Sequence, residues 1–199
     1  MERGDMAKVL RDRVAANQGR MGISVALLVD GETEFAAAGV LKAGETAPVM
    51  ADTLFEIGSI TKVFTSLLLA QMLLEGRMDL DSPVADYLPE GKVVPEFEGK
   101  AITLFDLATH HSGLPSIPDD MQTADPANPY ATYNAEGLYA FLAGHELSAA
   151  PGTAFAYSNI GVTLLSLAIV QAAGTPYAEL VQRRILDPLG MDETMLVVP

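Results

Sequence analysis

Two long apolar segments, residues 60–74 and 158–173, constrain the fold of this chain more than any other feature. The first is apolar nearly all the way round a helix, and a helix of that kind belongs in a protein core. The nearly uncharged stretches at these places, residues 63–74 and 159–174, are shorter than the ~20 residues that span a bilayer. We therefore expect two buried helices in a globular protein, and no membrane span.

The composition supports a globular chain and excludes several kinds of chemistry. Its 199 residues are 49% apolar and 19% charged, which suffices for one sizeable core or for two lobes that share one. The formal net charge is −14, and a field of that sign repels phosphate backbones, so we expect no nucleic-acid partner. The absence of cysteine excludes disulfides, thiolate catalysis and cysteine-bound metal.

The amino-terminal part of the chain is predicted to form a helix and then a hairpin. Residues 6–18 are typical of a short surface helix. Residues 22–29 form a β-rich apolar run, and Asp30-Gly31 follows it with the turn chemistry of a hairpin. We expect the second strand over residues 34–40, after a loop of two residues or more, so that the first lobe opens with an antiparallel pair.

The middle of the chain shows short helices separated by turns. The sequence Thr103-Leu-Phe-Asp106 resembles a capping box, with Asp in place of Glu or Gln. Asn134 is placed to cap a helix that ends at Gly144. Residues 115–133 are rich in Pro, Asp and Asn, which predicts a long loop of the kind that borders a cleft.

After the second apolar helix the chain is predicted to form one more helix and then to enter a strand. Thr175-Pro176 is a helix start, and Asp187-Pro188 marks the expected end of that helix. Residues 195–198 are apolar and are predicted to begin a strand.

Ser59 and Lys62 form the motif that indicates chemistry most directly. They stand where an apolar strand-like run enters the first apolar helix. A lysine three residues after a serine lies on the same helix face and can accept the hydroxyl proton. The helix amino terminus also offers free N–H groups to a developing negative charge. The alternative is structural: Ser59 merely caps the helix, and Lys62 is a solvated residue of its first turn.

Tyr157-Ser-Asn159 is the second candidate motif, and Pro151-Gly152 places it in a loop before the second apolar helix. A phenol can relay a proton to a leaving group. Asn159 can hold Lys62 and donate a hydrogen bond to a substrate amide. In the alternative interpretation Tyr157 anchors the loop, and Ser158 or Asn159 caps the helix.

The adjacent His110 and His111 do not favour a metal site. Neighbouring residues of a helix point about 100° apart, and no carboxylate cluster accompanies this pair. We expect both rings to hydrogen-bond the turn made by Gly113 and Pro115, and we expect His145 to lie at the surface. The chain is therefore predicted to need neither a metal nor an organic cofactor.

Four segments, taken in order, resemble the class C β-lactamase-related serine hydrolases, a family that includes D,D-carboxypeptidases, D-aminopeptidases and esterases. They are Phe55-Glu-Ile-Gly-Ser59-Ile-Thr-Lys62-Val-Phe-Thr, Leu107-Ala-Thr-His-His-Ser-Gly-Leu-Pro115, Pro151-Gly-Thr-Ala-Phe-Ala-Tyr157-Ser-Asn159-Ile-Gly and Ile185-Leu-Asp-Pro-Leu-Gly-Met191. The resemblance implies an α+β fold of the serine β-lactamase and penicillin-binding-protein type. In that fold an antiparallel sheet flanked by helices joins a mainly helical lobe, and the active site lies between them.

The resemblance also implies residue roles and substrates. Ser59 is expected to be the nucleophile, Lys62 a base and proton relay, Tyr157 a general acid and base, and Asn159 a substrate-orienting residue. The expected substrate is a small molecule: a β-lactam, a D-amino-acid peptide or a short ester, hydrolysed through an acyl-serine intermediate.

One family motif has no match here. The family carries Lys-Thr-Gly, or a His/Trp-x-Gly variant, on a strand after the Tyr-x-Asn segment, and that backbone supplies a second oxyanion donor. No such sequence follows Asn159, and one lost oxyanion donor costs ~3 kcal/mol of transition-state stabilisation. We therefore interpret the chain as C-terminally truncated. The alternative function is a catalytically incomplete fragment or scaffold that binds or assembles without turnover.

The expected organisation is one interwoven, incomplete catalytic unit in three parts. These are residues 1–80 with the hairpin and the serine-bearing helix, residues 81–157 as a mainly helical lobe, and residues 158–199 as helices that return to the sheet lobe.

Association and location are predicted from the same features. A hairpin over residues 22–40 without partner strands leaves an open edge, which predicts a covering by a complementary C-terminal segment or by another copy of the chain. The first eleven residues alternate charges and lack the apolar core of a signal peptide. We therefore expect a cytoplasmic protein, or a periplasmic or secreted one if a leader has been removed.

Overall fold

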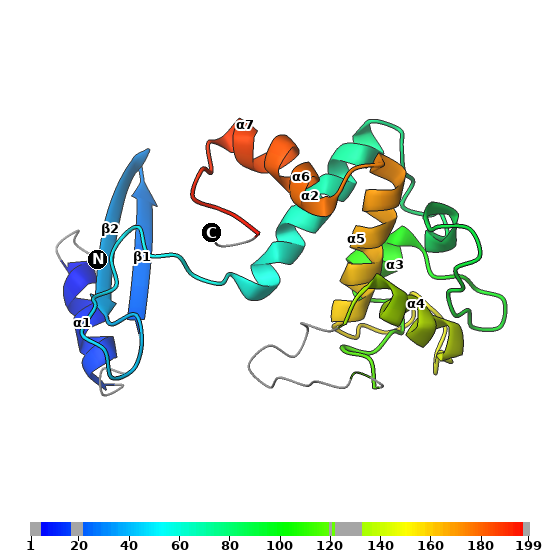
Figure 1. Ribbon diagram of the computed structural model, residues 1–199, viewed down its shortest axis with the longest axis horizontal. Helices are drawn as coiled ribbons and strands as arrows, with labels where there is room; N and C mark the ends of the chain where they lie inside the picture. Colours follow the sequence, from blue (N-terminus) through cyan, green and yellow to red (C-terminus); the bar gives the residue numbers. More distant parts are fainter. Residues whose placement is uncertain (1–4, 17–21, 120, 122–132, 197–199) are drawn as a thin grey trace. The chain divides into compact units, whose positions relative to one another are not determined.

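The structure is a computed structural model that describes residues 5–16, 22–119, 121 and 133–196. The chain divides into two compact units, Met1–Glu56 and Ile57–Pro199 (Figure 1). Each unit has its own apolar core. The three-part division expected from the sequence stays a prediction.

The first unit contains the predicted hairpin. Strand β1 (Gly22–Val29) pairs antiparallel with β2 (Glu32–Gly39). The second strand begins two residues earlier than expected, because the turn contains only Asp30 and Gly31. Their φ angles are 52° and 81°, and a two-residue turn with two positive φ values matches the twist of the flanking strands.

Helix α1 (Met6–Ala16) packs on one face of this hairpin. Met6 and Leu10 are buried against Ala36 of β2, and Figure 1 shows the helix lying along the two strands. The predicted helix over residues 6–18 is confirmed as far as Ala16, and its last two positions lie outside the described residues.

The other face of the hairpin carries exposed apolar side chains. Leu28 is 69% exposed and Phe35 is 58% exposed. Alternate residues of a strand point to opposite faces, so these two lie opposite the face that α1 covers.

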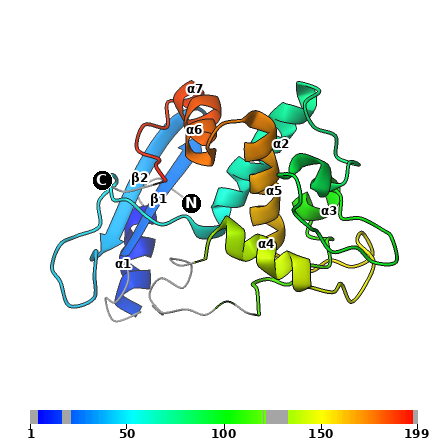
Figure 2. The same cartoon turned by 45° about the vertical axis from the view of Figure 1, so that its right-hand side comes forward.

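The second unit is built from helices. Its elements are α2 (Thr61–Leu74), α3 (Leu104–Ala108), α4 (Ala135–Gly144), α5 (Asn159–Ala173), α6 (Tyr177–Val181), a π-helical segment Gln182–Leu186, and α7 (Asp187–Leu189). Helix α5 lies beside α2 and also contacts α3 and α4, as Figures 1 and 2 show. Helix α6 packs against both α2 and α5.

One apolar core joins these helices. Its fully buried side chains come from the longer helices, from the π-helical segment and from two positions between helices: Leu68, Met72, Ile102, Leu104, Leu107, Leu114, Leu138, Leu142, Leu164, Leu165, Ile169 and Leu186. The predicted burial of the second apolar segment is confirmed, because seven residues of α5 are buried.

The expectation that the first apolar segment forms a buried core helix is confirmed for one side of that helix only. Helix α2 buries Thr65, Leu68, Leu69 and Met72, whereas Val63 is 64% exposed and Leu74 is 90% exposed. The physical reason is that α5 and α6 pack on one side of α2. Apolar composition shows that a helix can be buried, but the number of packed neighbours decides how much of it is.

Both predicted caps in the middle of the chain are present. Thr103 accepts a hydrogen bond from the Asp106 N–H at 3.1 Å, and the Asp106 carboxylate accepts from the Thr103 N–H at 3.0 Å. The Asn134 side chain accepts from the Gly137 N–H at 3.0 Å and so caps α4. Most of the predicted 115–133 loop lies outside the described residues.

The C-terminal part differs slightly from expectation. The predicted third helix starts as expected, at Tyr177, but its helical run continues to Leu189. It ends at Gly190 with φ 62°, in the left-handed region that glycine adopts without strain. Met195 and Leu196 are not in a strand, and residues 197–198 lie outside the described part.

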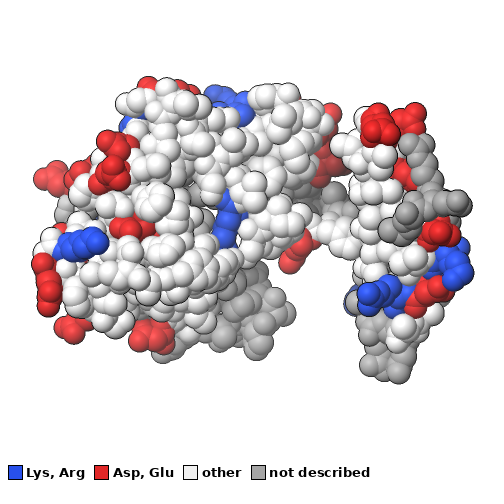
Figure 3. All heavy atoms as spheres, turned by 180° about the vertical axis from the view of Figure 1, so that it is seen from behind, with Lys and Arg blue, Asp and Glu red and all other residues white. Residues whose placement is uncertain are grey.

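The surface is predominantly acidic, as the composition indicates. Figure 3 shows Asp and Glu side chains spread over the visible face of the second unit, with fewer Lys and Arg side chains among them. Among the described helices, no single one is long and apolar enough to cross a membrane. By length and composition alone, α5 and residues Tyr177–Leu189 pass that test as a pair, but they are bent by 79°.

Candidate active site

Ser59 is placed by a change of backbone direction at the start of the second unit. Gly58 has φ 51°, a left-handed conformation that costs little for glycine and more for other residues. It opens the 3₁₀ turn Gly58–Ile60, which continues directly into α2. Ser59 is exposed at this end of the helix.

The Ser59 hydroxyl is in contact with an amine and a phenol. Lys62 Nζ donates to Ser59 Oγ at 3.2 Å, and Tyr157 OH donates to the same oxygen at 2.8 Å. Lys62 Nζ also lies 4.9 Å from the centre of the Tyr157 ring. The two groups that can take the proton of Ser59 therefore both touch its oxygen.

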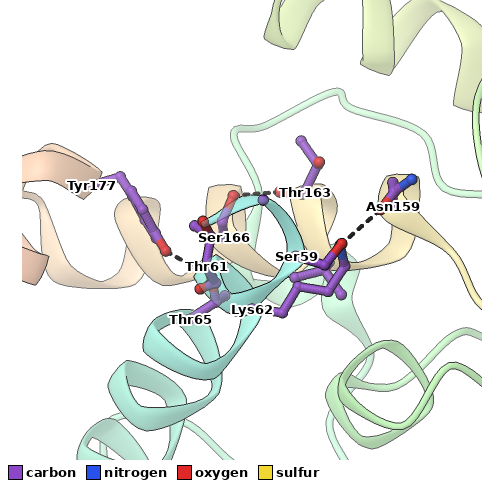
Figure 4. Close-up of a pocket in the computed structure, with 10 residues that line it drawn as sticks. Ser59, Thr61, Lys62, Thr65, Asn159, Thr163, Ser166 and Tyr177 are labelled. Atoms are coloured by element: carbon purple, nitrogen blue, oxygen red, sulfur yellow. Dashed lines mark hydrogen bonds between the residues drawn. The ribbon is translucent and has the colours of Figure 1, made fainter. Parts of the chain in front are cut away.

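Asn159 holds the other side of the lysine. Lys62 Nζ donates to Asn159 Oδ1 at 2.7 Å, a contact that Figure 4 shows between α2 and the start of α5. The Asn159 N–H donates to Ser116 O at 3.1 Å. The neighbouring Ser158 caps α5, because its Oγ accepts from the Gly161 N–H at 2.8 Å. These bonds fix Asn159 at the first position of the helix.

Tyr157 is 43% exposed, so burial does not orient its ring. Its pKa is lowered from the ordinary value, first by hydrogen bonding with Lys62 and then by hydrogen bonding with Ser59. Both contacts favour the phenolate. The same neighbours that hold Tyr157 in place thus raise the fraction of it that is phenolate, the form that can accept a proton.

His110 binds the chain on both sides of Tyr157. Its Nδ1 accepts from the Ser158 N–H at 3.2 Å, and its carbonyl oxygen accepts from the Ala156 N–H at 2.8 Å. The His110 and Tyr157 rings lie 4.5 Å apart, with an angle of 35° between their planes. Burial lowers the pKa of His110, and the positive charge of Lys62 lowers it further.

The expectation that both histidines hydrogen-bond the turn at Gly113 and Pro115 is wrong. His110 turns toward Tyr157 because its backbone is left-handed, with φ 60°. His111 Nδ1 instead lies 2.7 Å from Thr109 O and 3.1 Å from Thr109 Oγ1. Sequence spacing did not reveal this, because a non-glycine residue with positive φ is uncommon.

A hollow of about 410 Å³ lies beside Ser59 and Lys62. It is lined mainly by polar side chains: Ser59, Thr61, Lys62, Thr65, Asn159, Thr163, Ser166 and Tyr177, with Gly58 and Val162. Figure 4 shows Ser59 and Asn159 toward one end of it and Tyr177 toward the other.

Sequence analysis missed the pair of hydroxyl groups in this hollow. Tyr177 OH and Thr65 Oγ1 lie 2.7 Å apart, and burial raises the pKa of Tyr177. Thr65 comes three residues after Lys62 and so shares its helix face, which is a signal that sequence analysis can use. Tyr177 lies 112 positions from Thr65, and no local spacing indicates that contact.

The purely structural roles considered for the Ser59 and Tyr157 motifs fit the geometry only in part. Ser59 is not a capping residue, since α2 has Ile60 at its N-cap position with no side-chain cap. Lys62 is not merely solvated, because it donates to Ser59 and Asn159. In the second motif Ser158 is the cap of α5, as one of the alternatives held.

The remaining histidine does not add to the site. His145 stacks on Phe141 with ring centres 4.9 Å apart, and it is partly exposed. Within the described ranges, no group of three or more His, Asp or Glu side chains is arranged to hold a metal ion.

Known proteins of one family resemble this chain over most of its length. A family described as Beta-lactamase matches residues 6–199. The D-alanyl-D-alanine-carboxypeptidase/endopeptidase AmpH of Escherichia coli (strain K12) is 33% identical over 190 residues, which are 96% of this chain and 49% of that protein.

Solved structures of the same kind superpose on the chain. The β-lactamase/D-alanine carboxypeptidase from Yersinia pestis, complexed with citrate, matches with a TM-score of 0.89 and 28% identity, covering 99% of this chain and 56% of that one. A class C β-lactamase in complex with cefoxitin matches with a TM-score of 0.81 and 29% identity, covering 100% and 52%. The chain thus spans about half the length of the relatives that it matches.

Proposed function

Because the chain belongs to the β-lactamase family, with the α+β fold that its motifs predicted, we propose that it carries the nucleophilic half of a serine hydrolase. The relatives are named as β-lactamases and carboxypeptidases, which are hydrolases. The observation that carries the proposal is the pair of contacts on Ser59 Oγ, from Lys62 Nζ at 3.2 Å and from Tyr157 OH at 2.8 Å.

Acylation begins when the proton of Ser59 moves to Tyr157 or Lys62. The phenol and the serine hydroxyl can exchange donor and acceptor roles across their hydrogen bond, and the lowered pKa of Tyr157 favours the phenolate that accepts the proton. Lys62 stabilises that phenolate, and Asn159 keeps the amine in place. Ser59 Oγ then forms a bond to the substrate carbonyl carbon.

The backbone at Ser59 and the side chain of Tyr157 serve the tetrahedral intermediate and the leaving group. The Ser59 N–H lies in the first turn of a helical run, where backbone donors have no partner within the helix, and it is the candidate donor to the oxyanion. As the carbon–nitrogen or carbon–oxygen bond breaks, Tyr157 returns its proton to the leaving atom. The product of this step is an acyl ester on Ser59.

Deacylation repeats the sequence with water as the nucleophile. A water molecule gives its proton to Tyr157 or Lys62 and attacks the ester carbon, and the released Ser59 oxygen takes the proton back. The net reaction adds one water across one acyl bond. No step calls for a metal or an organic cofactor.

The substrate class follows from the family and from the site. We propose a β-lactam, a D-amino-acid peptide or a short ester, since relatives are named for β-lactam hydrolysis and D-alanyl-D-alanine cleavage. The donor groups that line the hollow, Ser59, Lys62 and Asn159 among them, are compatible with an amide or carboxylate on the substrate, which hydroxyl and amine donors can bind.

The second candidate function is binding or assembly without turnover. It is favoured by the exposed apolar face of the hairpin, on which Leu28 is 69% exposed and Phe35 is 58% exposed.

One experiment separates these two functions. The 199-residue protein is incubated with a fluorescent penicillin or a fluorophosphonate, and the intact mass is followed with time. We expect a single adduct that Ser59→Ala abolishes and that the matched variant Ser66→Ala, at an exposed serine of α2, retains. A penicilloyl adduct that decays shows hydrolysis, and one that persists supports binding without turnover; the fluorophosphonate adduct is stable in either case and reports only the nucleophile. No adduct on folded protein at high probe concentration contradicts the assignment of Ser59.

We also propose that the hairpin is covered by a partner, as its sequence predicted. The exposed Leu28 and Phe35 on the uncovered face of the hairpin support a covering by a complementary segment or by another copy of the chain. Size-exclusion chromatography with light scattering tests it: a well-behaved monomer across a range of concentrations contradicts self-association. The cytoplasmic location expected from the sequence stays a prediction.

A further inference from the structure

We propose that His110 is a positioning residue that holds Tyr157 against Ser59. The proposal rests on the function proposed above, in which Tyr157 moves protons to and from Ser59. It gives His110 a role other than the one expected from the sequence, which was to hydrogen-bond the turn at Gly113 and Pro115.

His110 contacts the Tyr157 segment at four points. Its carbonyl oxygen accepts from the N–H before Tyr157, at Ala156. Its Nδ1 accepts from the N–H after Tyr157, at Ser158. Its ring lies against the phenol ring at 4.5 Å, and its edge contacts Phe155 at 5.9 Å. One residue therefore fixes the backbone on both sides of Tyr157 and one face of its ring.

The backbone of His110 is specialised for this arrangement. Helix α3 ends at Ala108, and His110 adopts φ 60°, a left-handed conformation that is uncommon for non-glycine residues, although His adopts it more often than most. That turn directs the ring away from α3 and toward the segment before α5. A residue held in a rarely used conformation is consistent with a functional constraint.

The other contacts of Tyr157 do not fix it alone. Its ring is 43% exposed, and its hydroxyl group bonds to Ser59, a residue that is itself exposed. Lys62 Nζ also lies 4.9 Å from the ring centre, but neither contact holds the backbone beside Tyr157, so the phenol can still swing about its side-chain bonds. Because His110 packs on the ring and binds the flanking backbone, it limits this motion and keeps the oxygen in reach of Ser59.

The protonation state of His110 decides whether its ring can bind the Ser158 N–H. Nδ1 can accept the Ser158 N–H only when that nitrogen carries no proton. The groups that face the ring are Lys62 from α2, His111 from the same loop, and Tyr157. The positive charge of Lys62 disfavours a second positive charge at His110, so the ring stays neutral and its acceptor stays available.

A direct test measures the pKa of Tyr157 in the 199-residue protein by NMR, with ¹³C-labelled tyrosine and Tyr157→Phe for assignment. We expect His110→Ala to raise that pKa toward its ordinary value, because the phenol is held less closely to Lys62 and Ser59. His110→Asn should give an intermediate pKa, since asparagine tolerates positive φ and can accept the Ser158 N–H but offers no ring. His145→Ala is the matched control and should leave the pKa unchanged.

Acylation by a fluorescent penicillin gives the second readout. We expect His110→Ala to slow it ~10- to 100-fold, as misplacement of a catalytic group does, and His110→Asn to recover part of the rate. An unchanged Tyr157 pKa in folded His110→Ala or His110→Asn overturns the proposal. If His110→Ala fails to fold, His110→Asn carries the test. If wild-type Ser59 is never acylated, the proposed function fails, but the pKa comparison still decides the role of His110.

Discussion

At the scale of residues, the chemistry of this chain depends on contacts between two distant segments. Tyr157 lies 98 positions from Ser59, and Asn159 lies 97 positions from Lys62. Each pair nevertheless meets within hydrogen-bond distance at the start of α2. The residue types could be predicted from the sequence, and the roles that we propose for them, as nucleophile, base and orienting group, lead to direct tests.

Replacing Lys62 by arginine separates its charge from its ability to take a proton. Arginine keeps the positive charge but does not lose its proton in proteins. We expect Lys62→Arg to lower the acylation rate of Ser59 by ~10²- to 10⁴-fold, the usual contribution of a general base. The rate is measured with a fluorescent penicillin. Lys42→Arg, at an exposed lysine of the first unit, is the control, and a rate for Lys62→Arg within about threefold of wild type contradicts the assignment.

The lowered pKa of Tyr157 predicts the pH dependence of acylation. The phenolate is the accepting form, so the rate should rise with pH through a midpoint below the ordinary value of 10.0 and then level off. The free energy of unfolding changes with pH in the same direction. Because the pKa of Tyr157 is lower in the folded state than in the unfolded state, the phenolate stabilises the fold at pH values above the unfolded-state pKa. This stabilisation is lost as the pH falls through the folded-state pKa. Acylation rates measured across pH provide the check. A Tyr157→Phe variant that keeps the same rise would show that another group titrates.

At the scale of elements, the site depends on how α5 begins. Ser158 is fully buried, and its Oγ accepts from the Gly161 N–H at 2.8 Å while donating to Pro115 O at 2.7 Å. This one hydroxyl group starts the helix and ties it to the segment after α3. Since Tyr157 and Asn159 flank Ser158 in the chain, the cap also sets where both site residues emerge.

Removing this cap should destabilise the second unit. We expect Ser158→Ala to lower the free energy of unfolding by ~1–2 kcal/mol, because it removes an N-cap and leaves the Pro115 carbonyl oxygen without this donor. Denaturant unfolding measures the change as a lower midpoint with an unchanged slope. Ser66→Ala on the exposed side of α2 should shift the midpoint little. Equal midpoints for the two variants would show that the cap contributes nothing.

At the scale of the whole molecule, two units have separate cores, and the described site residues all belong to the second. Helices α2 and α5 form the centre of that unit, and α3, α4 and α6 pack around them. The formal charge of −14 adds long-range repulsion of anionic polymers, so the absence of a nucleic-acid partner stays a prediction of composition.

Replacing Leu68 by alanine tests whether this single core stabilises the second unit. Leu68 is fully buried between helices, and replacing a buried leucine by alanine costs ~2–5 kcal/mol. Leu74 lies on the same helix but is 90% exposed, so Leu74→Ala should change the free energy of unfolding by less than ~0.5 kcal/mol. Denaturant unfolding of both variants measures the difference. Similar losses in the two would contradict the one-sided burial of α2.

The sequence by itself determined the features that neighbouring residues define. The Thr103 and Asp106 capping box, the Asn134 cap, the Asp30-Gly31 turn and the helical spacing of Ser59 and Lys62 were all predictable. Each involves groups no more than four positions apart, whose geometry follows from backbone dihedral angles and local hydrogen bonds. The family could also be predicted, because its motifs are short local sequences in a fixed order.

Only the tertiary structure decided which distant groups meet. It turned His110 toward Tyr157 rather than toward Gly113, paired Thr65 with Tyr177, and left one side of α2 uncovered. The physical reason is that such contacts depend on how whole helices pack, which sums many weak interactions along the chain. Spacing in the sequence constrains a residue's helix face, whereas the partner on that face is chosen by the fold.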